Sequence, residues 1–343
     1  MEKVMASLAN YFATNSKDEI HLILYGKPHE IFYDIHTLVI IHKPHFAFNT
    51  KYRRINTIKT ACFIRSTIRK IRPITILSFG HIWNSLVMLS LLGIKKKIFL
   101  SDRAQPDLPI SFVYQKLRKY LYPKATGIIA QTIYAKDFFQ RWMPYNNIRV
   151  IANPIHEVPQ TMLGQRQNII LSVGRLIKTK HHDKLINIFN QINNSDWQLI
   201  IVGGDAEKQN IHELLNLQIN ALDLQQRVLL TGEVQNVIPY YIQANIFAFT
   251  SSTEGFPNAL AEAMAHGCAC ISYDCIAGPA DLIDDGVNGF LIPEGNEKLY
   301  IEKLRLLMED ADLRKQFGLA AREKMKQFST DKIAQQYLDF ILA

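Results

Sequence analysis

The sequence has few cysteines, no long hydrophobic run and no low-complexity tract, and each shortage excludes a class of protein. Four cysteines occur in 343 residues, and they form no pair of CxxC knuckles, which argues against a disulfide scaffold or a zinc site. The longest apolar runs, such as Trp83–Ile94, are interrupted and shorter than the ~20 residues that span a bilayer. We therefore expect a folded cytoplasmic protein whose cysteines are reduced core residues.

Acidic side chains are scarce in the first half of the chain. Residues 1–150 hold 23 Lys and Arg against 8 Asp and Glu, a charge of +15, whereas residues 151–343 hold 16 against 23. So basic a half attracts an anionic lipid surface or nucleic acid, or is simply solvated. Since no segment is long enough to span, we expect any contact with a membrane to be peripheral.

Short β-branched runs alternate with amphipathic stretches of helical period, the pattern of parallel sheets with crossover helices. The length suits two domains, because a single core seldom grows beyond about 250 residues. The predicted strands are Ile20–Leu24, Leu38–Ile41, Ile74–Phe79, Lys97–Leu100, Gly127–Ala130, Ile148–Ile151, Ile169–Val173, Gln198–Val202, Val228–Leu230, Ile246–Phe249, Cys270–Ser272 and Phe290–Ile292.

The fold class that this rhythm predicts is α/β, with two doubly wound Rossmann-like domains facing across a cleft. We expect an amino-terminal domain over residues 1–152, a polar linker over 153–167 and a carboxy-terminal domain over 168–325. A terminal helix over 326–343 is expected to pack back on the first domain. In such folds the ligand binds beyond the carboxyl ends of the strands, so the chemistry should lie there.

A first candidate site follows the strand Ile169–Val173, where Gly174 and Arg175 precede Lys180 at the start of a helix. Glycine lets a ligand approach the backbone, and the two cations would converge on a diphosphate, helped by the positive end of the helix. The alternative is that both cations are merely solvated loop residues.

A second and stronger signal follows the strand Ile246–Phe249. Glu254 lies in the strand-to-helix loop, and Glu262 lies inside a helix that is otherwise built of Ala, Leu and Met. A carboxylate on so apolar a helix is costly to bury unless it meets donors such as ribose hydroxyls; the alternative is that it reaches solvent. Gly267 suits the end of that helix.

Together these motifs resemble the retaining glycosyltransferases of family 4, which have the GT-B fold. The resemblance is dense from Asn168 to Pro293, where the Glu254/Glu262 pair is followed by Ala277–Pro279 and Asp285–Pro293. It is thinner in the first half, where the matching segments are Leu100–Pro106, Ala130–Thr132 and Val150–Pro154.

The resemblance implies roles for the site residues. Arg175 and Lys180 would hold the donor diphosphate, Glu262 the ribose hydroxyls, and Glu254 the transferred sugar. Gly174 and the start of the following helix would complete the donor site; those residues are Gly255, Phe256, Pro257, Asn258 and Ala259. In the first half His81 and Arg103 are candidate contacts of the acceptor or sugar. His181 and His182 are expected on the surface.

The implied enzyme is a retaining hexosyl- or N-acetylhexosaminyltransferase that works in polysaccharide or lipid-linked glycan assembly. With this function we expect peripheral contact with an anionic surface at the inner face of the cytoplasmic membrane and no nucleic-acid partner. Its donor would be a nucleotide sugar, with UDP favoured over GDP, and its acceptor a carbohydrate or polyprenyl-diphosphate-linked glycan. Because cations and helix dipoles would balance the diphosphate, and no D-x-D pair follows a strand, we expect no metal and no cofactor.

Two other functions stay open. One is a non-catalytic protein that binds sugar nucleotides or nucleic acid. The other is a Rossmann oxidoreductase, which is disfavoured because no G-x-G-x-x-G follows a strand with an acidic residue at the proper distance.

The start of the chain carries one further expectation. Residues 1–12 have helical spacing, whereas a doubly wound domain normally opens on a strand. We therefore expect the amino-terminal domain to lack its first strand, about 10 to 15 residues with its turn.

Overall fold

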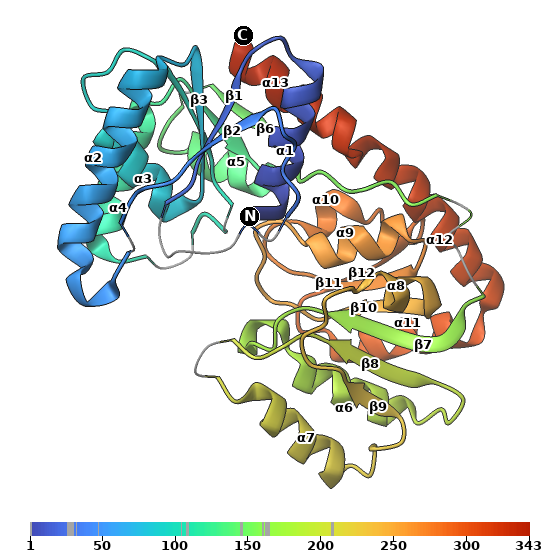
Figure 1. Ribbon diagram of the computed structural model, residues 1–343. Helices are drawn as coiled ribbons and strands as arrows, with labels where there is room; N and C mark the ends of the chain where they lie inside the picture. The colour runs from blue at the N-terminus through green and yellow to red at the C-terminus, as the bar shows by residue number, and fades with distance from the viewer. Residues whose placement is uncertain are drawn as a thin grey trace. The chain divides into compact units, whose positions relative to one another are not determined.

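The chain folds into two compact units, one formed by Met1–Pro154 with Thr330–Ala343 and the other by Ile155–Ser329 (Figure 1). We call them unit 1 and unit 2. The structure, a computed structural model, describes residues 2–25, 31, 33–46, 48–103, 105–107, 110–144, 147–159, 161, 165–206 and 209–343. Both units are α/β with parallel sheets, so the expected pair of Rossmann-like domains is confirmed. The predicted strands are all present, with ends that differ by at most two residues.

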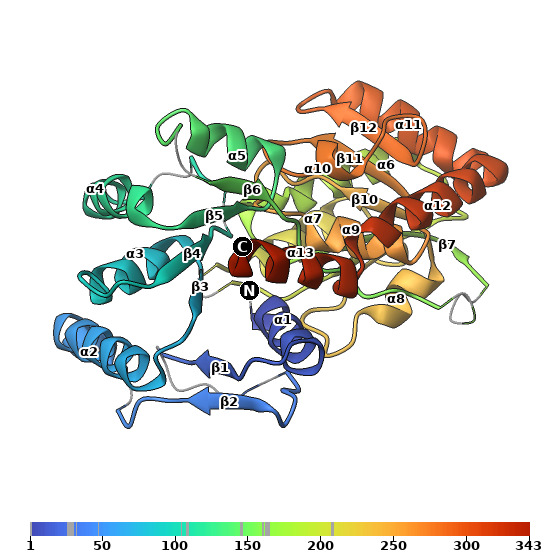
Figure 2. The same ribbon diagram turned by 90° about the horizontal axis from the view of Figure 1, so that it is seen from above.

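Unit 1 holds two parallel sheets, β1-β2 and β3-β4-β5-β6. Its strands are β1 (Ile20–Ile23), β2 (Val39–His42), β3 (Thr75–Phe79), β4 (Lys97–Ser101), β5 (Gly127–Ala130) and β6 (Ile148–Val150). Its α-helices are α1 (Glu2–Asn15), α2 (Arg53–Ile71), α3 (His81–Ser90), α4 (Phe112–Leu121), α5 (Ile133–Gln140) and α13 (Thr330–Leu342). Helices α2, α3 and α4 cover one face, and α1 and α13 lie on the other (Figure 2).

The last helix, α13, is part of the core of unit 1. Its Tyr337 and Phe340 are buried, and the Phe340 ring packs edge-on against Phe99 of β4 at 5.1 Å. Gly127 of β5 lets that ring approach, since a Cβ at this position would lie 2.8 Å from its Cζ atom. The β3-β4-β5-β6 sheet is therefore covered by the last helix of the sequence.

Unit 2 is built on one six-stranded parallel sheet of order β12-β11-β10-β7-β8-β9. Its strands are β7 (Gln167–Val173), β8 (Gln198–Val202), β9 (Val228–Leu230), β10 (Ala244–Phe249), β11 (Ala269–Asp274) and β12 (Gly289–Pro293). Its α-helices are α6 (His182–Ile192), α7 (Ile211–Ala221), α8 (Ile238–Gln243), α9 (Asn258–Ala265), α10 (Pro279–Leu282), α11 (Glu297–Glu309) and α12 (Ala311–Met325).

The strand order of unit 2 fixes where a ligand can bind. The chain runs outward from β7 through β8 and β9, then returns to the other side of β7 and runs outward again from β10. Such a reversal between neighbouring parallel strands opens a crevice at their carboxyl ends. The loops after β7 and β10 therefore share this position, and these loops carry Lys180 and Glu254.

Two expectations from the composition can be compared with the structure. Within the described ranges, none of the helices combines the length and hydropathy that crossing a bilayer requires. Cys268, Cys270 and Cys275 are buried, and burial raises the pKa of each thiol, that of Cys275 to about 12. Cys62 is exposed on α2, so its assignment to the core was wrong.

Candidate functional site

The loop after β7 is held by close backbone packing against the loop after β8. The amide of Gly174 donates to the carbonyl of Val202 at 2.9 Å. At Gly203, where φ is +154°, a Cβ would lie 1.9 Å from the Gly174 carbonyl oxygen, so only glycine fits there. A Cβ at Gly174 would lie 3.3 Å from the Lys180 side chain. These two glycines thus set the path of the loop that carries Arg175.

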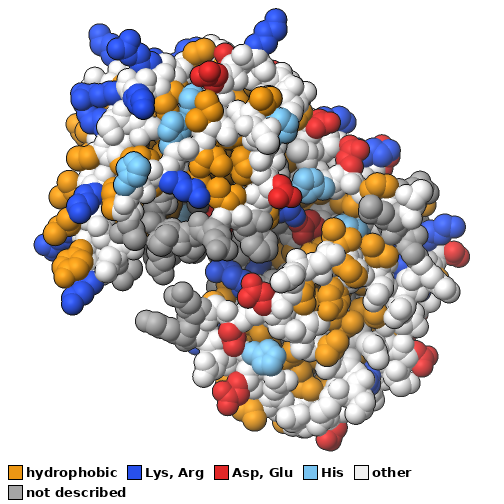
Figure 3. Space-filling model, viewed as in Figure 1, with side chains coloured by type: hydrophobic (Ala, Val, Ile, Leu, Met, Phe, Trp, Pro, Cys, Tyr) orange, Lys and Arg blue, Asp and Glu red, His pale blue; other side chains and the backbone are white. Residues whose placement is uncertain are grey.

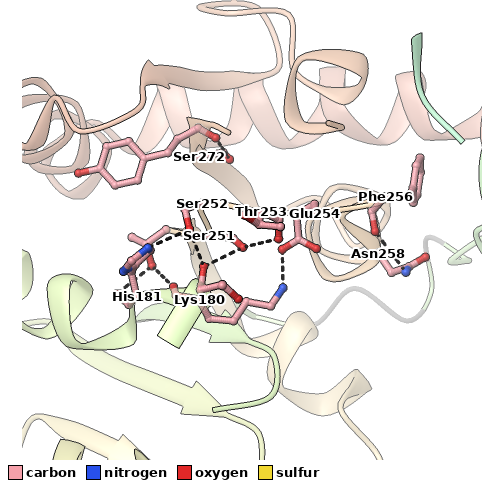
Figure 4. Close-up of polar contacts among 12 residues, drawn as sticks. Lys180, His181, Ser251, Ser252, Thr253, Glu254, Phe256, Asn258 and Ser272 are labelled. Atoms are coloured by element: carbon pink, nitrogen blue, oxygen red, sulfur yellow. Dashed lines mark hydrogen bonds and ion pairs between the residues drawn. The ribbon is translucent and has the colours of Figure 1, made fainter. Parts of the chain in front are cut away.

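Lys180 and Glu254 form an ion pair between the two loops. The ammonium nitrogen lies 2.5 Å from Oε1 of Glu254, and only 17% and 12% of the two side chains are exposed. Figure 4 shows both side chains pointing toward each other from the two loops. The ammonium also lies 5.0 Å from the ring centre of Phe249, at the end of β10. Because little water screens this pair, its interaction with the charge of a bound ligand would be strong.

A series of hydrogen bonds connects the β10–α9 loop to the loop after β7 (Figure 4). The Thr250 hydroxyl donates to the Lys180 carbonyl at 2.8 Å, and the Ser251 hydroxyl donates to the Thr179 carbonyl at 3.2 Å. His181 Nε2 lies 2.9 Å from the Ser252 hydroxyl oxygen. The two loops therefore form one rigid platform, and Lys180 and Glu254 keep their separation.

Glu262 lies half-buried on α9 and accepts a hydrogen bond from the Tyr241 hydroxyl at 3.2 Å. Tyr241 is buried; burial first and then the Glu262 charge raise the pKa of its phenol well above the usual value. The ring of Tyr241 stacks on His266 at 5.1 Å. The carboxylate on the apolar helix thus has a donor within the protein, which the sequence reasoning did not foresee.

Arg175 and His182 differ sharply in burial. Arg175 is exposed on the loop after β7. His182 is 3% exposed, so its assignment to the surface was wrong, and His181 is half-buried. Burial, followed by the charge of Lys180, lowers the pKa of His182 to about 4. A neutral imidazole therefore lies beneath the basic loop at neutral pH.

The start of α9 is assembled from the residues between Glu254 and the helix. Phe256 and Pro257 are buried, while Gly255 and Ala259 are half-buried and Asn258 is exposed. Pro257, the N-cap residue of α9, makes no side-chain cap hydrogen bond. The first turn of a helix has backbone amides that can donate to a ligand. Gly278, with φ +120°, packs on Pro257, where a Cβ would lie 2.3 Å from Cδ.

The two candidates in unit 1 lie at the carboxyl ends of its strands. His81 is half-buried and begins α3, directly after β3. Arg103 follows β4 and donates to the Tyr337 hydroxyl at 3.3 Å and to Asn153 Oδ1 at 2.5 Å. Burial lowers the pKa of its guanidinium, and Tyr337 and Asp102 oppose that effect. Arg103 therefore also has a structural task, because it joins α13 to the sheet.

The three segments of the first half that carry the weaker family resemblance contact one another in unit 1. Gln131 donates to the same Asn153 oxygen that Arg103 binds. These residues belong to the segments 100–106, 130–132 and 150–154, of which residue 104 lies outside the described residues. Sequence reasoning missed the buried cluster beneath them, where the Tyr122 hydroxyl donates to Asp102 at 3.1 Å.

Sequence reasoning also missed Tyr241 and Gly203, whereas Gly278 was part of the Ala277–Pro279 match but had no role assigned. For Gly203 a signal was present, because it follows a strand as Gly174 does. Tyr241 had no such signal. In the described part of the chain, no three His, Cys, Asp or Glu side chains are grouped as metal ligands would be.

Comparison with known proteins relates this geometry to a family. The family model of the glycosyl transferases group 1 matches residues 157–324, which include both loops. The chain is 31% identical over 269 residues to a Campylobacter jejuni protein, the N-acetylgalactosamine-N,N'-diacetylbacillosaminyl-diphospho-undecaprenol 4-alpha-N-acetylgalactosaminyltransferase, covering 75% of this chain and 72% of that one. It is 24% identical over 351 residues to the amylovoran biosynthesis glycosyltransferase AmsD of Erwinia amylovora, covering 99% and 95%.

Solved structures share the fold. The Anabaena HepE structure in complex with UDP superposes with a TM-score of 0.80 at 16% identity, covering 99% of this chain and 95% of that chain. A mutant of S. aureus TarM, in complex with fondaparinux, alpha-GlcNAc-glycerol and UDP, gives a TM-score of 0.70 at 21% identity. That match covers 82% of this chain but 59% of TarM, so this chain spans about three fifths of TarM.

Proposed function

This chain belongs to the glycosyl transferases of group 1, and from that membership we propose that it transfers a sugar from a nucleotide sugar in polysaccharide or lipid-linked glycan assembly. The observation that carries the proposal is the platform at the β7/β10 reversal, where Lys180 and Glu254 are held together and Glu262 follows on α9. The Campylobacter and Erwinia relatives are named for such transfers. No observation favours an oxidoreductase or a non-catalytic binding protein.

The donor would lie over the two loops of unit 2. Arg175 and Lys180 bind the diphosphate, and the amides at the start of α9 add a partial positive charge. Glu262 binds the ribose hydroxyls. Glu254, with the backbone of Gly255 and Phe256, binds the transferred sugar. The Lys180–Glu254 pair then bridges the diphosphate and the sugar, the two groups between which the bond breaks.

The proposed reaction retains the anomeric configuration. The bond from the anomeric carbon to the diphosphate oxygen breaks, the acceptor oxygen bonds to that carbon, and the leaving phosphate takes the acceptor proton. The protein then supplies no nucleophile, and Glu254 is not a general base. Its work is to orient the donor and to stabilise charge that grows on the diphosphate, for which Arg175, Lys180 and the α9 amides suffice without a divalent ion.

We propose a UDP-hexose or a UDP-N-acetylhexosamine as donor. Both structural neighbours hold UDP, and the Campylobacter relative is named as an N-acetylgalactosaminyltransferase. A carbohydrate carried on polyprenyl diphosphate is the proposed acceptor, since that relative is named for a diphospho-undecaprenol substrate. His81 and Arg103, at the strand ends of unit 1, are the proposed contacts of the acceptor or sugar.

Such an acceptor would place the protein at the inner face of the cytoplasmic membrane, and unit 1 has a surface suited to an anionic bilayer. Arg53 of α2 donates to the Tyr114 hydroxyl of α4 at 3.4 Å, which ties the starts of these helices together. Apolar side chains on the two helices are between 55% and 67% exposed, namely Ile55, Ile58, Phe112, Val113 and Tyr120. Exposed cations accompany them: Arg53, Arg54, Lys59, Lys116 and Lys119.

We call these ten residues the α2–α4 surface. Lys and Arg side chains also gather around α2 in Figure 3. Apolar side chains flanked by cations bind anionic interfaces.

Donor screening tests the proposed function directly. Purified protein is mixed with UDP- and GDP-hexoses and N-acetylhexosamines, and the melting temperature and the release of nucleoside diphosphate are measured. We expect one UDP-sugar to raise the melting temperature most and to be cleaved slowly by water or faster with an acceptor. Stabilisation without release by any donor, with a lipid-linked acceptor present, would instead support a binding protein.

A further inference from the structure

His182 is a buried polar side chain whose capacity for hydrogen bonds is unused. It is the first residue of α6 and is 3% exposed. Within the described ranges, neither nitrogen of its ring has a hydrogen-bond partner. Buried polar groups nearly always have partners, so a ring that is unpaired at both nitrogens requires an explanation beyond packing.

The ring lies against the turn that carries Arg175. The backbone of Gly174 and that of Arg175 both favour the protonated form of the ring, although neither completes a hydrogen bond to it. Only a carbonyl oxygen of the backbone can accept from an imidazolium, so each residue offers its carbonyl. A Cβ on Gly174 would lie 3.3 Å from the Lys180 side chain, so Lys180 borders the same turn. His182 thus lies under both cations that we assign to the donor diphosphate.

The protonation state of the ring decides how many of these carbonyls it can satisfy. A neutral imidazole has one N–H donor and one acceptor nitrogen, whereas an imidazolium has two donors. Two carbonyl oxygens therefore match the charged ring and not the neutral one. In the free protein, burial and then the charge of Lys180 lower the pKa of His182 to about 4. The ring is consequently neutral at pH 7 and faces one acceptor with another.

Few charges act on this imidazole. Lys180 disfavours the imidazolium, whereas Asp183, which follows on α6, favours it. At the start of α6, α7 contributes the uncharged Gln218, which donates to the Asp183 carbonyl at 2.9 Å. Neither β7 nor β8 carries a titratable side chain. The first turns of α7 and α11 carry titratable side chains that are not among the groups shifting the pKa of the ring, namely His212, Glu213, Glu297 and Lys298. A diphosphate bound at Lys180 would therefore be the strongest new charge near the ring.

We propose that His182 is a positioning residue that takes up a proton when the donor diphosphate binds, and then donates to both carbonyls of the Gly174–Arg175 turn. The inference rests on the proposed function. The proton comes from solvent, and no covalent bond forms or breaks. A negative charge within about 4 to 6 Å raises a pKa by about 1 to 3, enough to protonate the ring in mildly acidic solution. The two hydrogen bonds would fix the turn that carries Arg175, and the imidazolium would add positive charge behind a diphosphate whose negative charge grows in the reaction.

The experiment uses the full chain, isotope-labelled in its histidine rings, with UDP as the probe. Nuclear magnetic resonance follows the ring nitrogens from about pH 7.5 to pH 5 with and without saturating UDP. The signal of His182 is identified by its loss in His182→Gln. Without UDP we expect this signal to stay that of a neutral ring, and with UDP we expect it to titrate about two pH units higher than in the free protein. The exposed His36 of unit 1 is the internal reference and should titrate identically in both series. Uridine, which lacks the diphosphate, should leave His182 neutral.

A proton that is taken up on binding also makes the affinity depend on pH. Calorimetry should show the affinity for UDP rising about tenfold between about pH 7 and pH 5, relative to that of His182→Gln. This comparison cancels the titration of UDP itself, because both proteins bind the same ligand. His182→Asn, a second amide that does not titrate, replaces His182→Gln if that variant fails to fold. Spectra of the unaltered protein test the proposal even without a variant, since one histidine signal should titrate only when UDP is bound.

The outcomes separate this proposal from the proposed function. If UDP binds while every histidine signal titrates as in the free protein, the role of His182 is overturned and the donor site stands. An equal effect of uridine, or the same pH dependence of UDP affinity with and without the imidazole, would overturn that role as well. If UDP does not bind at any pH, the donor site and the role of His182 are both overturned.

Discussion

The ammonium of Lys180 and the carboxylate of Glu254 are each other's partners, although they come from loops 74 residues apart in the sequence. The proposed function assigns one to the diphosphate and the other to the sugar of the same donor. A donor that enters this site therefore meets a pair that is already formed and oriented. No free energy is then needed to bring the two charges together when the donor binds. The site is therefore preorganised for breaking the bond between the diphosphate and the sugar.

Breaking this pair on one side should destabilise unit 2. In Lys180→Met the carboxylate, and in Glu254→Gln the ammonium, is left without its partner, and we expect a loss of about 2 to 3 kcal/mol in the free energy of unfolding for each. The double variant should lose less than the sum of the two. Urea unfolding of all four proteins measures the coupling. The ion pair between Lys324 and Asp284, whose carboxylate is 57% exposed, serves as control and should couple by less than about 1 kcal/mol. Additive losses at Lys180 and Glu254 would contradict the prediction.

Arg175 should matter for turnover and not for stability. It is exposed, so Arg175→Ala should leave the unfolding free energy unchanged, while kcat falls by about a hundredfold because charge on the leaving diphosphate loses a partner. Lys178→Ala removes an exposed cation from the same loop and is the matched control, with kcat within about twofold of the unaltered protein. Similar turnover for the two variants would remove Arg175 from the diphosphate site.

Glu262→Ala should weaken nucleotide binding. A ribose would lose charge-assisted hydrogen bonds worth about 1.5 kcal/mol or more, which raises the dissociation constant of UDP about tenfold. Because Tyr241 donates to the same carboxylate, Tyr241→Phe separates the two tasks of Glu262. Calorimetry should give near-normal UDP affinity for Tyr241→Phe and weak affinity for Glu262→Ala. If both variants weaken UDP binding equally, Glu262 supports the structure of the site through Tyr241 and does not bind the ribose directly.

The stability of unit 2 should depend on pH through His182. The pKa of this imidazole is lowered from 6.5 to about 4, so between those values the unfolded chain binds more protons than the folded one. The contribution of His182 to the free energy of unfolding is therefore fully present above about pH 6.5. It is lost as the pH falls toward 4, by up to about 3 kcal/mol. Unfolding free energies measured from about pH 7 to pH 4.5 should fall less steeply in His182→Gln than in the unaltered protein. Parallel slopes would show that another group titrates.

Binding to anionic vesicles should depend on both parts of the α2–α4 surface. Sedimentation with vesicles containing phosphatidylserine should decline as the Debye length shrinks from about 10 to 3 Å between 0.1 and 1 M salt. Lys116→Glu with Lys119→Glu should abolish the salt-dependent part, and Phe112→Ser with Val113→Ser should weaken binding at every salt concentration. Equal sedimentation with neutral vesicles would refute the prediction.

The fold and the position of the candidate site were predictable because both depend on local signals. The strands are recognisable as β-branched runs. Glu254 lies in the loop that follows one of them, and Glu262 lies in the next helix, so sequence alone identifies their position. Parallel strands bring their carboxyl ends to one edge, so the sheet order then places the site.

What the sequence could not supply depends on contacts between distant segments. The pairing of Lys180 with Glu254 follows from β7 and β10 being neighbours, which no local pattern encodes. The burial of His182 depends on how α6 packs against the loops after β7 and β8. The hydroxyl of Tyr241, which donates to Glu262, comes from α8, two elements before α9. Cys62 was misassigned because an apolar neighbourhood in sequence does not fix which side of α2 a residue occupies.

The packing of α13 has a consequence for how the protein is made. Unit 2 is one continuous segment, whereas unit 1 needs Tyr337 and Phe340 in its core, more than 170 residues after Pro154. At about 5 to 20 residues per second, the ribosome therefore needs at least about nine seconds after it has made Pro154 to reach the last helix of unit 1. Unit 2 can complete its fold during that interval, so the order of maturation runs opposite to the order of synthesis. A nascent-chain chaperone would find its longest-lived apolar surface on the part of the protein that emerged first.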